Sequence, residues 1–447
     1  MRTETNIKFI NHSSVLIQYE QNFVLTDPWY DKPAFGSWLP NPPSSVHPAY
    51  LVALSQSTVN FTIAISHGHD DHLDDLFLSL FPKNINILIP KYKSVGLLKR
   101  LKRIGFVNIF QADEDGIQIG CFQFKSYINP KICPDDSILT IKSKNMFVVH
   151  ANDNWQKIET QHLQKIRKDC SLVDNDKTLY MSQCNLADGW PALYKDYSDA
   201  EKQNLHTKRI RNIIQNALCN GEAAGCKNFL NYAGHASAFV KGEEHLETSI
   251  SYTTNSYIKN FAREYGFSIK VLEMIPGDIF NFKNVIQQFP GINLNNNNLK
   301  NASRNFYKVC GVVDRCDTYQ KIQDKTYDYS KNLKIFLNNF NSFVLNRVGY
   351  TNFNSDIVGF KIVIRSKNIV EEVIIGQRNS DSTKTAIFEV SENMLYKLLN
   401  GDINWENLYI GFQSTVKTVP EKINIRAPVR WLASYGYVYQ RDVKNGK

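Results

Sequence analysis

Three histidines and two aspartates occupy six consecutive positions of this chain, from His67 to His72. The full run, Ser66-His67-Gly68-His69-Asp70-Asp71-His72, follows the apolar segment 61–65, which has the composition of a buried strand that ends where the polar residues begin. Imidazole and carboxylate groups are ligands that suit zinc and iron. On a turn leaving a strand, the first two histidines can face one metal while Asp71 and His72 face a second. The run therefore predicts a metal site at the end of a strand.

The spacing His-x-His-x-Asp-His resembles that of the metallo-β-lactamase superfamily. The segments His12-Ser13-Ser14-Val15-Leu16-Ile17 and Thr26-Asp27-Pro28-Trp29 resemble the opening of the branch that includes the ascorbate-6-phosphate lactonases. This resemblance implies an α/β fold, the αββα sandwich, with a metal-binding catalytic domain. It also implies that Asp27 supports a metal-binding histidine from behind, and we expect His12 in the same supporting layer.

The same resemblance supplies two further metal ligands. Asp153, in Asn152-Asp153 after the strand-like residues 147–149, stands where the superfamily usually has Gly-Asp and an aspartate that bridges two metals. His235, just past a strand and Gly234, matches the last ligand and is favoured over His245, which lies among glutamates. His150 lies within the strand before Asp153, so we expect it behind the ligands.

One ligand of the zinc hydrolases with this fold is missing, because no histidine lies between His72 and His150. Cys133, Asp135, Asp136 or a water molecule are the alternatives for this place. The absence of this histidine argues against an ordinary zinc hydrolase.

Several short segments occur in a common order across residues 150–410: Asn152-Asp153, Met181-Ser182-Gln183, Gly189-Trp190-Pro191, Tyr194, Tyr232-Ala233-Gly234, Tyr252-Thr253-Thr254-Asn255, Ile258-Lys259-Asn260, Ile275-Pro276-Gly277-Asp278 and residues 398–408. Together they resemble the CMP-N-acetylneuraminate hydroxylase family. That family carries an N-terminal Rieske domain, whereas this chain begins directly at the metallo-β-lactamase-like segments. Electrons for oxygen chemistry would then come from a separate protein or from the substrate.

Two reactions follow from these patterns. In the favoured one, one or two irons at His67, His69, Asp71, His72, Asp153 and His235 activate oxygen and oxidise a polar or anionic small molecule. In the alternative, two zinc or manganese ions activate a water molecule for hydrolysis, and Asp70 and Asp71 orient it. A purely structural metal is disfavoured, since structural zinc sites are closed and usually rich in cysteine. Candidates to line the substrate pocket are Trp190, Tyr194, Tyr232 and Asn255, with Lys259 meeting an anionic group.

With 447 residues, the chain is long enough for two or three domains. We expect a catalytic domain over 1–285, an Asn-rich linker and the start of a helix over 286–320, and an α+β extension over 321–447 packed on the first domain. The net charge of +9 is modest, and the basic run 99–103 is most simply a solvated helical face. No nucleic-acid-binding module, membrane span or signal peptide is recognisable, so we expect a cytoplasmic protein.

Overall fold

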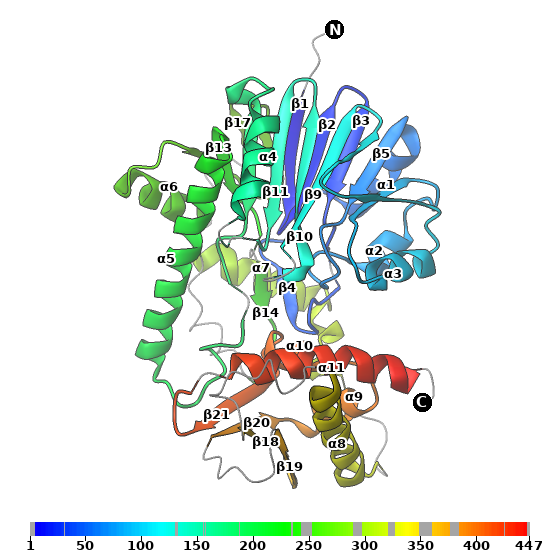
Figure 1. Ribbon diagram of the computed structural model, residues 1–447, viewed down its shortest axis with the longest axis vertical. Coiled ribbons are helices and arrows are strands. Elements are labelled where there is room, and N and C mark those ends of the chain that lie inside the picture. The colour runs from blue at the N-terminus through cyan, green and yellow to red at the C-terminus, as the bar shows by residue number, and fades with distance from the viewer. Residues whose placement is uncertain are drawn as a thin grey trace.

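A computed structural model describes residues 5–30, 32–129, 133–154, 156, 158–186, 188–233, 236–242, 253–288, 297–320, 327–347, 360–375, 384–423 and 425–444. Figure 1 shows two parts stacked along the long axis of the molecule, a large one from the first two thirds of the chain and a smaller one from the C-terminal third.

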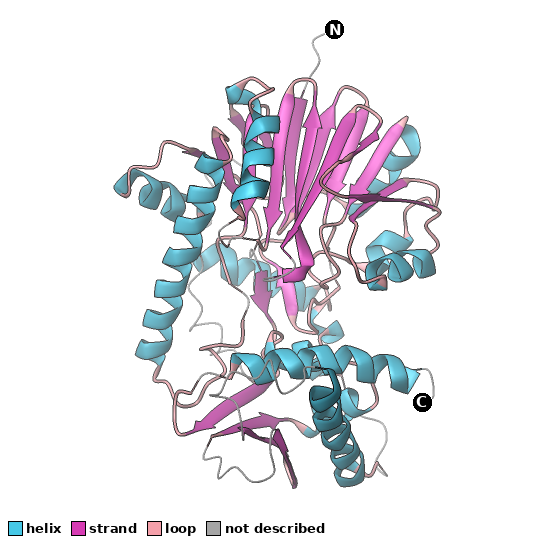
Figure 2. Cartoon of the chain, in the orientation of Figure 1, coloured by secondary structure: helices cyan, strands magenta, loops and turns pink. Residues whose placement is uncertain are grey.

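The larger part is built on two sheets that face each other (Figure 2). Within the described residues, the first sheet has the strand order β17 (Val285–Ile286), β16 (Ile279–Phe280), β1 (Thr5–Asn11), β2 (Ser14–Tyr19), β3 (Asn22–Thr26), β5 (Asn60–Ala64), β6 (Asn86–Pro90) and β7 (Asn108–Ala112). The second sheet has the order β15 (Lys270–Val271), β13 (Asn228–Asn231), β12 (Thr178–Ser182), β11 (Met146–Asn152), β10 (Cys133–Ser143), β9 (Phe122–Asn129) and β8 (Ile117–Ile119).

Helices cover the outer faces of both sheets. The helices α1 (Pro48–Ser57), α2 (Asp75–Ser79) and α3 (Gly96–Ile104) share an apolar cluster with the first sheet, while α4 (Thr160–Cys170), α5 (Asp199–Ala223) and α6 (Asn255–Glu264) share one with the second. A third apolar cluster fills the space between the sheets. These four layers confirm the αββα sandwich predicted from the sequence.

Parallel pairing explains why the sequences of the central strands are continuous apolar runs. It also explains why the carboxyl ends of these strands lie together. The strands β3, β5, β6 and β7 pair in parallel, as do β11, β12, β13 and β15. Strands covered on both faces are apolar on both faces, and every residue of β11 is buried. Each fully buried large side chain contributes about 1.5–3 kcal/mol. The carboxyl ends of these strands meet at one edge of the sandwich.

The C-terminal part has α+β architecture, as predicted. Its sheet has the order β19 (Ile369–Ile375), β18 (Phe360–Ser366), β20 (Thr385–Val390) and β21 (Ser414–Val419), and its helices are α8 (Tyr329–Arg347), α9 (Glu392–Leu399), α10 (Trp405–Tyr409) and α11 (Arg426–Lys444). One apolar cluster joins this part to the sandwich, because Trp29, Phe35 and Trp38 belong to the same cluster as Phe388 and Trp405.

The segment between the two parts, expected to hold an Asn-rich linker and the start of a helix, contains helix α7 (Asn297–Val309). This helix begins inside the Asn-rich stretch, and residues 289–296 lie outside the described residues. Tyr307 of α7 donates a hydrogen bond to the carbonyl of Pro40, in the short strand β4 (Trp38–Pro40), which pairs with β14 (Ala236–Ala238). The segment is therefore partly helical and packed against the first part.

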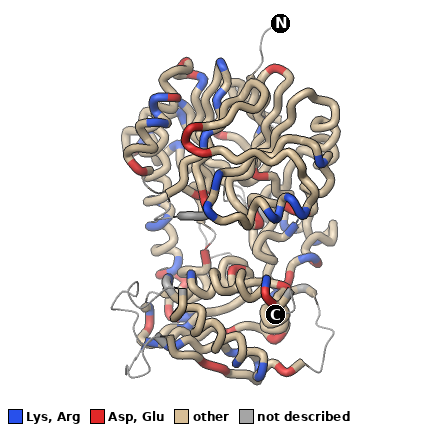
Figure 3. The backbone as a smooth tube through the Cα atoms, turned by 45° about the vertical axis from the view of Figure 1, so that its right-hand side comes forward, with Lys and Arg blue, Asp and Glu red and all other residues tan. Residues whose placement is uncertain are grey.

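Neither part has a one-sided charge distribution. Figure 3 shows Lys and Arg interspersed with Asp and Glu over both. No helix in the described part of the chain has the length and apolar character needed to cross a membrane.

Candidate metal centre

The predicted ligand residues gather at the edge where the parallel strands end. His67 to His72 follow β5, Asp27 follows β3, Asp153 follows β11, and His12 lies in the turn between β1 and β2. Three non-glycine residues at this edge, His12, Asp27 and Asn152, have positive φ values of 38°, 33° and 57°. Such backbone conformations are costly and concentrate at functional sites.

Two groups of side chains at this edge have the composition and spacing of metal sites. One consists of His67, His69 and Asp153, and the other of His12, Asp71 and His72; in each, one ligand atom per residue lies within 4.8 Å of the others. His67 Nε2 is 2.8 Å from His69 Nδ1 and 3.8 Å from an Asp153 oxygen.

Asp153 lies between the two groups. Its second carboxylate oxygen is 3.7 Å from His72 Nε2, while an Asp71 oxygen is 3.5 Å from that nitrogen and 3.3 Å from His12 Nε2. One carboxylate oxygen of Asp153 therefore lies near each group. His12, which we expected behind the ligands, instead lies among them.

Asp136, one of the alternatives for the missing histidine, lies beside His67. The nearer oxygen of its carboxylate is 3.6 Å from His67 Nδ1, and the residue is 9% exposed. Burial, and next the Asp153 carboxylate, raise the pKa of Asp136 to about 8. Two carboxylates held together in a buried site favour a cation between them. Of the alternatives left open by the sequence, Asp136 lies beside a predicted ligand, while the side chains of Cys133 and Asp135 are outside the described part of the structure.

Asp27 organises the site from behind. The carboxylate is fully buried, and it accepts hydrogen bonds from the Ser66 amide (2.7 Å), the Ser66 hydroxyl (2.6 Å), His72 Nδ1 (3.0 Å) and His150 Nε2 (2.9 Å). Burial opposes ionisation, but His150 and His72 hold the pKa of Asp27 well below its usual value. Tyr232 in turn forms a hydrogen bond with His150 Nδ1. A carboxylate that accepts from one histidine nitrogen fixes the ring so that the other nitrogen is available to a metal.

The residues present fit a divalent metal ion. The inward nitrogen of His72 and one oxygen of Asp71 are buried without a hydrogen-bond partner among the described residues. Buried polar atoms without partners are rare and need an explanation. Burial disfavours a charged His72, yet Asp71 and Asp153 raise its pKa well above the usual value. The carboxylates thus favour positive charge at the point where the ligand atoms converge.

Asp70 is not part of either group. The carboxylate is 3.1 Å from Lys32 Nζ and 3.3 Å from an Arg100 nitrogen, and Arg100 also binds Asp75 and the Gly68 carbonyl. The predicted role of Asp70 in orienting a nucleophile is therefore not supported by its position. The basic face of α3 is likewise not wholly solvated, because Arg100 turns inward and holds the ligand loop.

The proposed substrate residues do not lie together. Tyr232 is fully buried behind His150, Asn255 is buried and donates to the Met274 carbonyl, and Lys259 pairs with Glu273 at the surface. None of these three therefore has the predicted position on a substrate pocket. Trp190 and Tyr194 do line a cavity, at the junction of α5 and the C-terminal part. The last predicted ligand, His235, lies outside the described residues.

The C-terminal part contributes residues that the sequence reasoning missed. Burial lowers the pKa of His69, but Glu406 of α10, followed by Asp71 and Asp153, raises it above its usual value. Tyr437 of α11 donates a hydrogen bond to Glu406. Phe35 packs against His69 with 5.9 Å between ring centroids. Glu406 lies within the hydroxylase-like segment 398–408, which was the signal available in the sequence.

Comparisons with known proteins give short or distant similarities. No family model matches the chain. A stretch of 106 residues, 24% of this chain, is 30% identical to a protein from Mycolicibacterium smegmatis named for a Rieske 2Fe-2S iron–sulfur centre, and 28% identical to one of the same description from Mycobacterium tuberculosis. The match spans only 20% of the length of each relative.

Solved structures similar to this chain include metal-dependent hydrolases and a diiron hydroxylase. Igni18, a metallo hydrolase from Ignicoccus hospitalis, is 14% identical with a TM-score of 0.41 over 63% of this chain and 100% of its own. An isothiocyanate hydrolase from Delia radicum gut bacteria is 14% identical with a TM-score of 0.40 over 62% of this chain and 98% of its own. CmlA, a diiron β-hydroxylase from Streptomyces venezuelae, is 14% identical with a TM-score of 0.39 over 64% of this chain and 55% of its own.

Proposed function

We propose that this chain, which has the metallo-β-lactamase fold, is an iron-dependent oxygenase acting on a polar or anionic small molecule. The observation that carries the proposal is the pair of adjacent groups, His67-His69-Asp153 and His12-Asp71-His72, each with two imidazoles and one carboxylate. Two histidines and one carboxylate with open positions are typical of the non-haem iron oxygenases.

The rest of the donor set supports the same reading. With Asp136 beside His67, the site offers four imidazoles and three carboxylates, and no cysteine belongs to either group among the described residues. A thiolate-rich set would favour a structural zinc site, whereas nitrogen and oxygen donors with open positions suit a reactive metal. Iron held here would supply the redox chemistry that oxygen activation requires.

The chain's own residues would hold and orient these ligands. Asp27 fixes the ring of His72, and Ser66, which also donates to Asp27, lies 3.0 Å from His67 Nδ1. Arg100 holds the Gly68 carbonyl at 2.9 Å and thereby the ligand loop. Such rigid support is what a metal site needs to keep its ligands in place. Electrons would come from a separate donor protein or from the substrate.

A dinuclear zinc or manganese hydrolase is the second candidate. The same observation allows it, since catalytic zinc sites also use two histidines and one carboxylate and keep a position open for water. Asp71 or Asp153 would then hold the attacking water through a carboxylate oxygen. Asp136 in place of a histidine counts against this candidate.

Metal content and oxygen dependence separate the two functions. Protein expressed aerobically in iron-rich medium should contain more iron than zinc, and after reduction it should consume oxygen when given substrate. The matched control is Asp136→His, which restores the histidine of the zinc hydrolases and should shift the metal content toward zinc. Full activity with zinc as the only metal, under strictly anaerobic conditions, would establish the hydrolase instead.

A further inference from the structure

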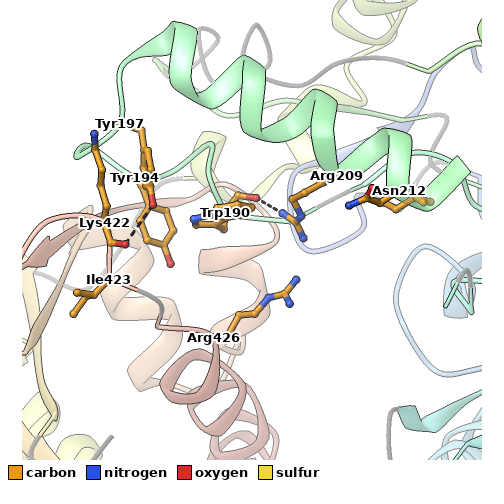
Figure 4. Close-up of a pocket in the computed structure, with 9 residues that line it drawn as sticks. Trp190, Tyr194, Tyr197, Arg209, Asn212, Lys422, Ile423 and Arg426 are labelled. Carbon is orange, nitrogen blue, oxygen red and sulfur yellow. Dashed lines mark hydrogen bonds between the residues drawn. The ribbon is translucent and has the colours of Figure 1, made fainter. Parts of the chain in front are cut away.

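A cavity of about 390 Å³ lies between α5 and the start of α11, apart from the residues of the metal centre. The residues that line it include Trp190, Tyr194, Tyr197, Arg209, Lys422 and Arg426. Three of these residues are cations and none is a carboxylate. Figure 4 shows Arg209 from α5 and Arg426 from α11 extending toward the same space beside Trp190.

Arg209 is held in place before any ligand arrives. One terminal nitrogen donates to the Trp190 carbonyl and the other to Asp188, both at 2.6 Å, and the guanidinium lies 4.8 Å from the centre of the Trp190 ring. A guanidinium fixed in this way loses little entropy on binding a ligand. Trp190 remains half-buried, so part of its ring faces the cavity.

The other two cations lie across the cavity from Arg209. Lys422 pairs with Glu201 at 2.6 Å and lies 5.4 Å from the centre of the Tyr197 ring. Arg426 is exposed and is the first residue of α11. A cation in the first turn is unfavourable for the helix dipole, which favours negative charge at this end. An anion bound beside Arg426 would offset that cost.

We propose that this cavity binds the carboxylate or phosphate group of an anionic small molecule, with Arg209 and Arg426 as the donors and Trp190 as part of the apolar wall. Guanidinium groups recognise both anions through paired N–H donors. The proposal goes beyond the metal chemistry and holds for either reaction, because it concerns binding alone. The cavity is close to the metal centre along α10: the Tyr409 hydroxyl is 3.2 Å from that of Tyr194, and Glu406 lies one turn earlier in that helix.

The test is calorimetric titration of the full-length, metal-loaded chain with potassium phosphate and, separately, with succinate. We expect saturable binding of at least one of them, and the one that binds tighter identifies the preferred anion. Arg426→Gln should raise Kd at least about tenfold, the effect of losing a charge-assisted hydrogen-bond pair. Arg441→Gln, which removes an exposed arginine of the same helix paired with Asp442, should leave Kd within about twofold.

Arg426→Glu separates loss of binding from loss of folding. A carboxylate in the first turn suits the helix dipole, so this variant should still unfold in one cooperative transition and fail to bind either anion. Metal content should equal that of the wild type in all three variants, which distinguishes this site from the metal centre. Absence of binding to the wild type, or a Kd unchanged in Arg426→Gln and Arg426→Glu, would overturn the proposal.

Discussion

Replacing Asp27 by asparagine should damage both the stability of the sandwich and its affinity for metal. The carboxylate accepts four hydrogen bonds, three of them on Oδ2 and one, from the Ser66 amide, on Oδ1. Asparagine has the same shape but only one acceptor oxygen. In one orientation of the amide its NH₂ group faces Ser66 Oγ, His72 and His150, and in the other it faces the Ser66 N–H. Neither orientation satisfies all four donors.

The size of the effect follows from the burial of this network. Hydrogen bonds to a charged group contribute about 1.5–3 kcal/mol each, and breaking a buried charged pair costs about 3–5 kcal/mol. We therefore expect Asp27→Asn to lower the free energy of unfolding of the metal-free chain by about 3–5 kcal/mol. Loss of a carboxylate behind a metal-binding histidine typically weakens metal affinity by about 10–100-fold, and we expect this range here.

Urea unfolding of the metal-free chain measures the first effect, and competition with a chelator of known affinity measures the second. Asp113→Asn is the control, since this carboxylate is exposed and pairs only with Lys91, at 3.2 Å, among the described cations. Asp113→Asn should change neither the free energy of unfolding nor the free energy of metal binding by more than about 0.5 kcal/mol. Because the pKa of Asp27 is lowered in the folded chain, this carboxylate stabilises the fold at pH values above its usual pKa of 3.8. That stabilisation is lost progressively as the pH falls below 3.8. Metal affinity of Asp27→Asn within twofold of the wild type would refute the supporting role.

Three further outcomes are expected. Purified protein should carry one or two metals per chain and lose them in the double variant His69→Ala with Asp71→Ala, and an unchanged metal content by elemental analysis would contradict the ligand assignment. Burial and Asp153 raise the pKa of Asp136 to about 8, so this carboxyl should hold a proton at pH 7 in the metal-free chain and release it when metal binds. Calorimetry in buffers of different ionisation enthalpy should therefore show that Asp136→Asn releases fewer protons than the wild type on metal binding. Equal proton release would exclude Asp136 from the site. Proteolysis near Asn295 should leave the two parts associated, because they share an apolar cluster, and a stable, fully active N-terminal fragment would show that they are independent.

The sandwich and the edge that carries the site could be predicted because both follow from local sequence. Parallel strands covered on both faces read as apolar runs, and polar residues follow directly where those strands end, as at 61–65 and 147–149. The confirmed strands β5 and β11 end within one to three residues of the predicted positions. Helix α9 was equally predictable, since Ser391 caps its start and Gly401 follows its end with a φ of 71°.

The choice of Asp136 could not be made from the sequence, because neighbouring residues of a strand point to opposite faces. The register of β10 against β9 shifts between Cys133 and Ile138. An irregularity of this kind reverses which residue faces the site. The sequence pattern therefore limits the replacement for the missing histidine to a few residues but does not select one of them.

Contacts between distant segments were beyond the sequence for a different reason. Asp70 and Asp71 are adjacent and chemically identical, yet Lys32 and Arg100 pair with the first while His12 and His72 surround the second. Only the packing of α3 and of the loop after β3 against the ligand loop decides between them. The resemblance to a hydroxylase likewise named residues without fixing the direction of their side chains, which is why Tyr232 and Lys259 were misplaced.

The contact between the two parts of the molecule gives the C-terminal part a place in the metal centre. The loop that carries Phe35, which packs on His69, is tied to the segment after α10 by three hydrogen bonds: Ser37 to the Gly411 carbonyl (2.6 Å), Trp38 to the Ile410 carbonyl (2.7 Å) and Gln413 to the Phe35 carbonyl (3.0 Å). Helix α10 itself carries Glu406, whose carboxylate raises the pKa of His69. Because the loop and the helix are held together, a displacement of the C-terminal part would alter both the packing and the electrostatics of His69. The sandwich alone therefore lacks part of the environment of its own metal ligands.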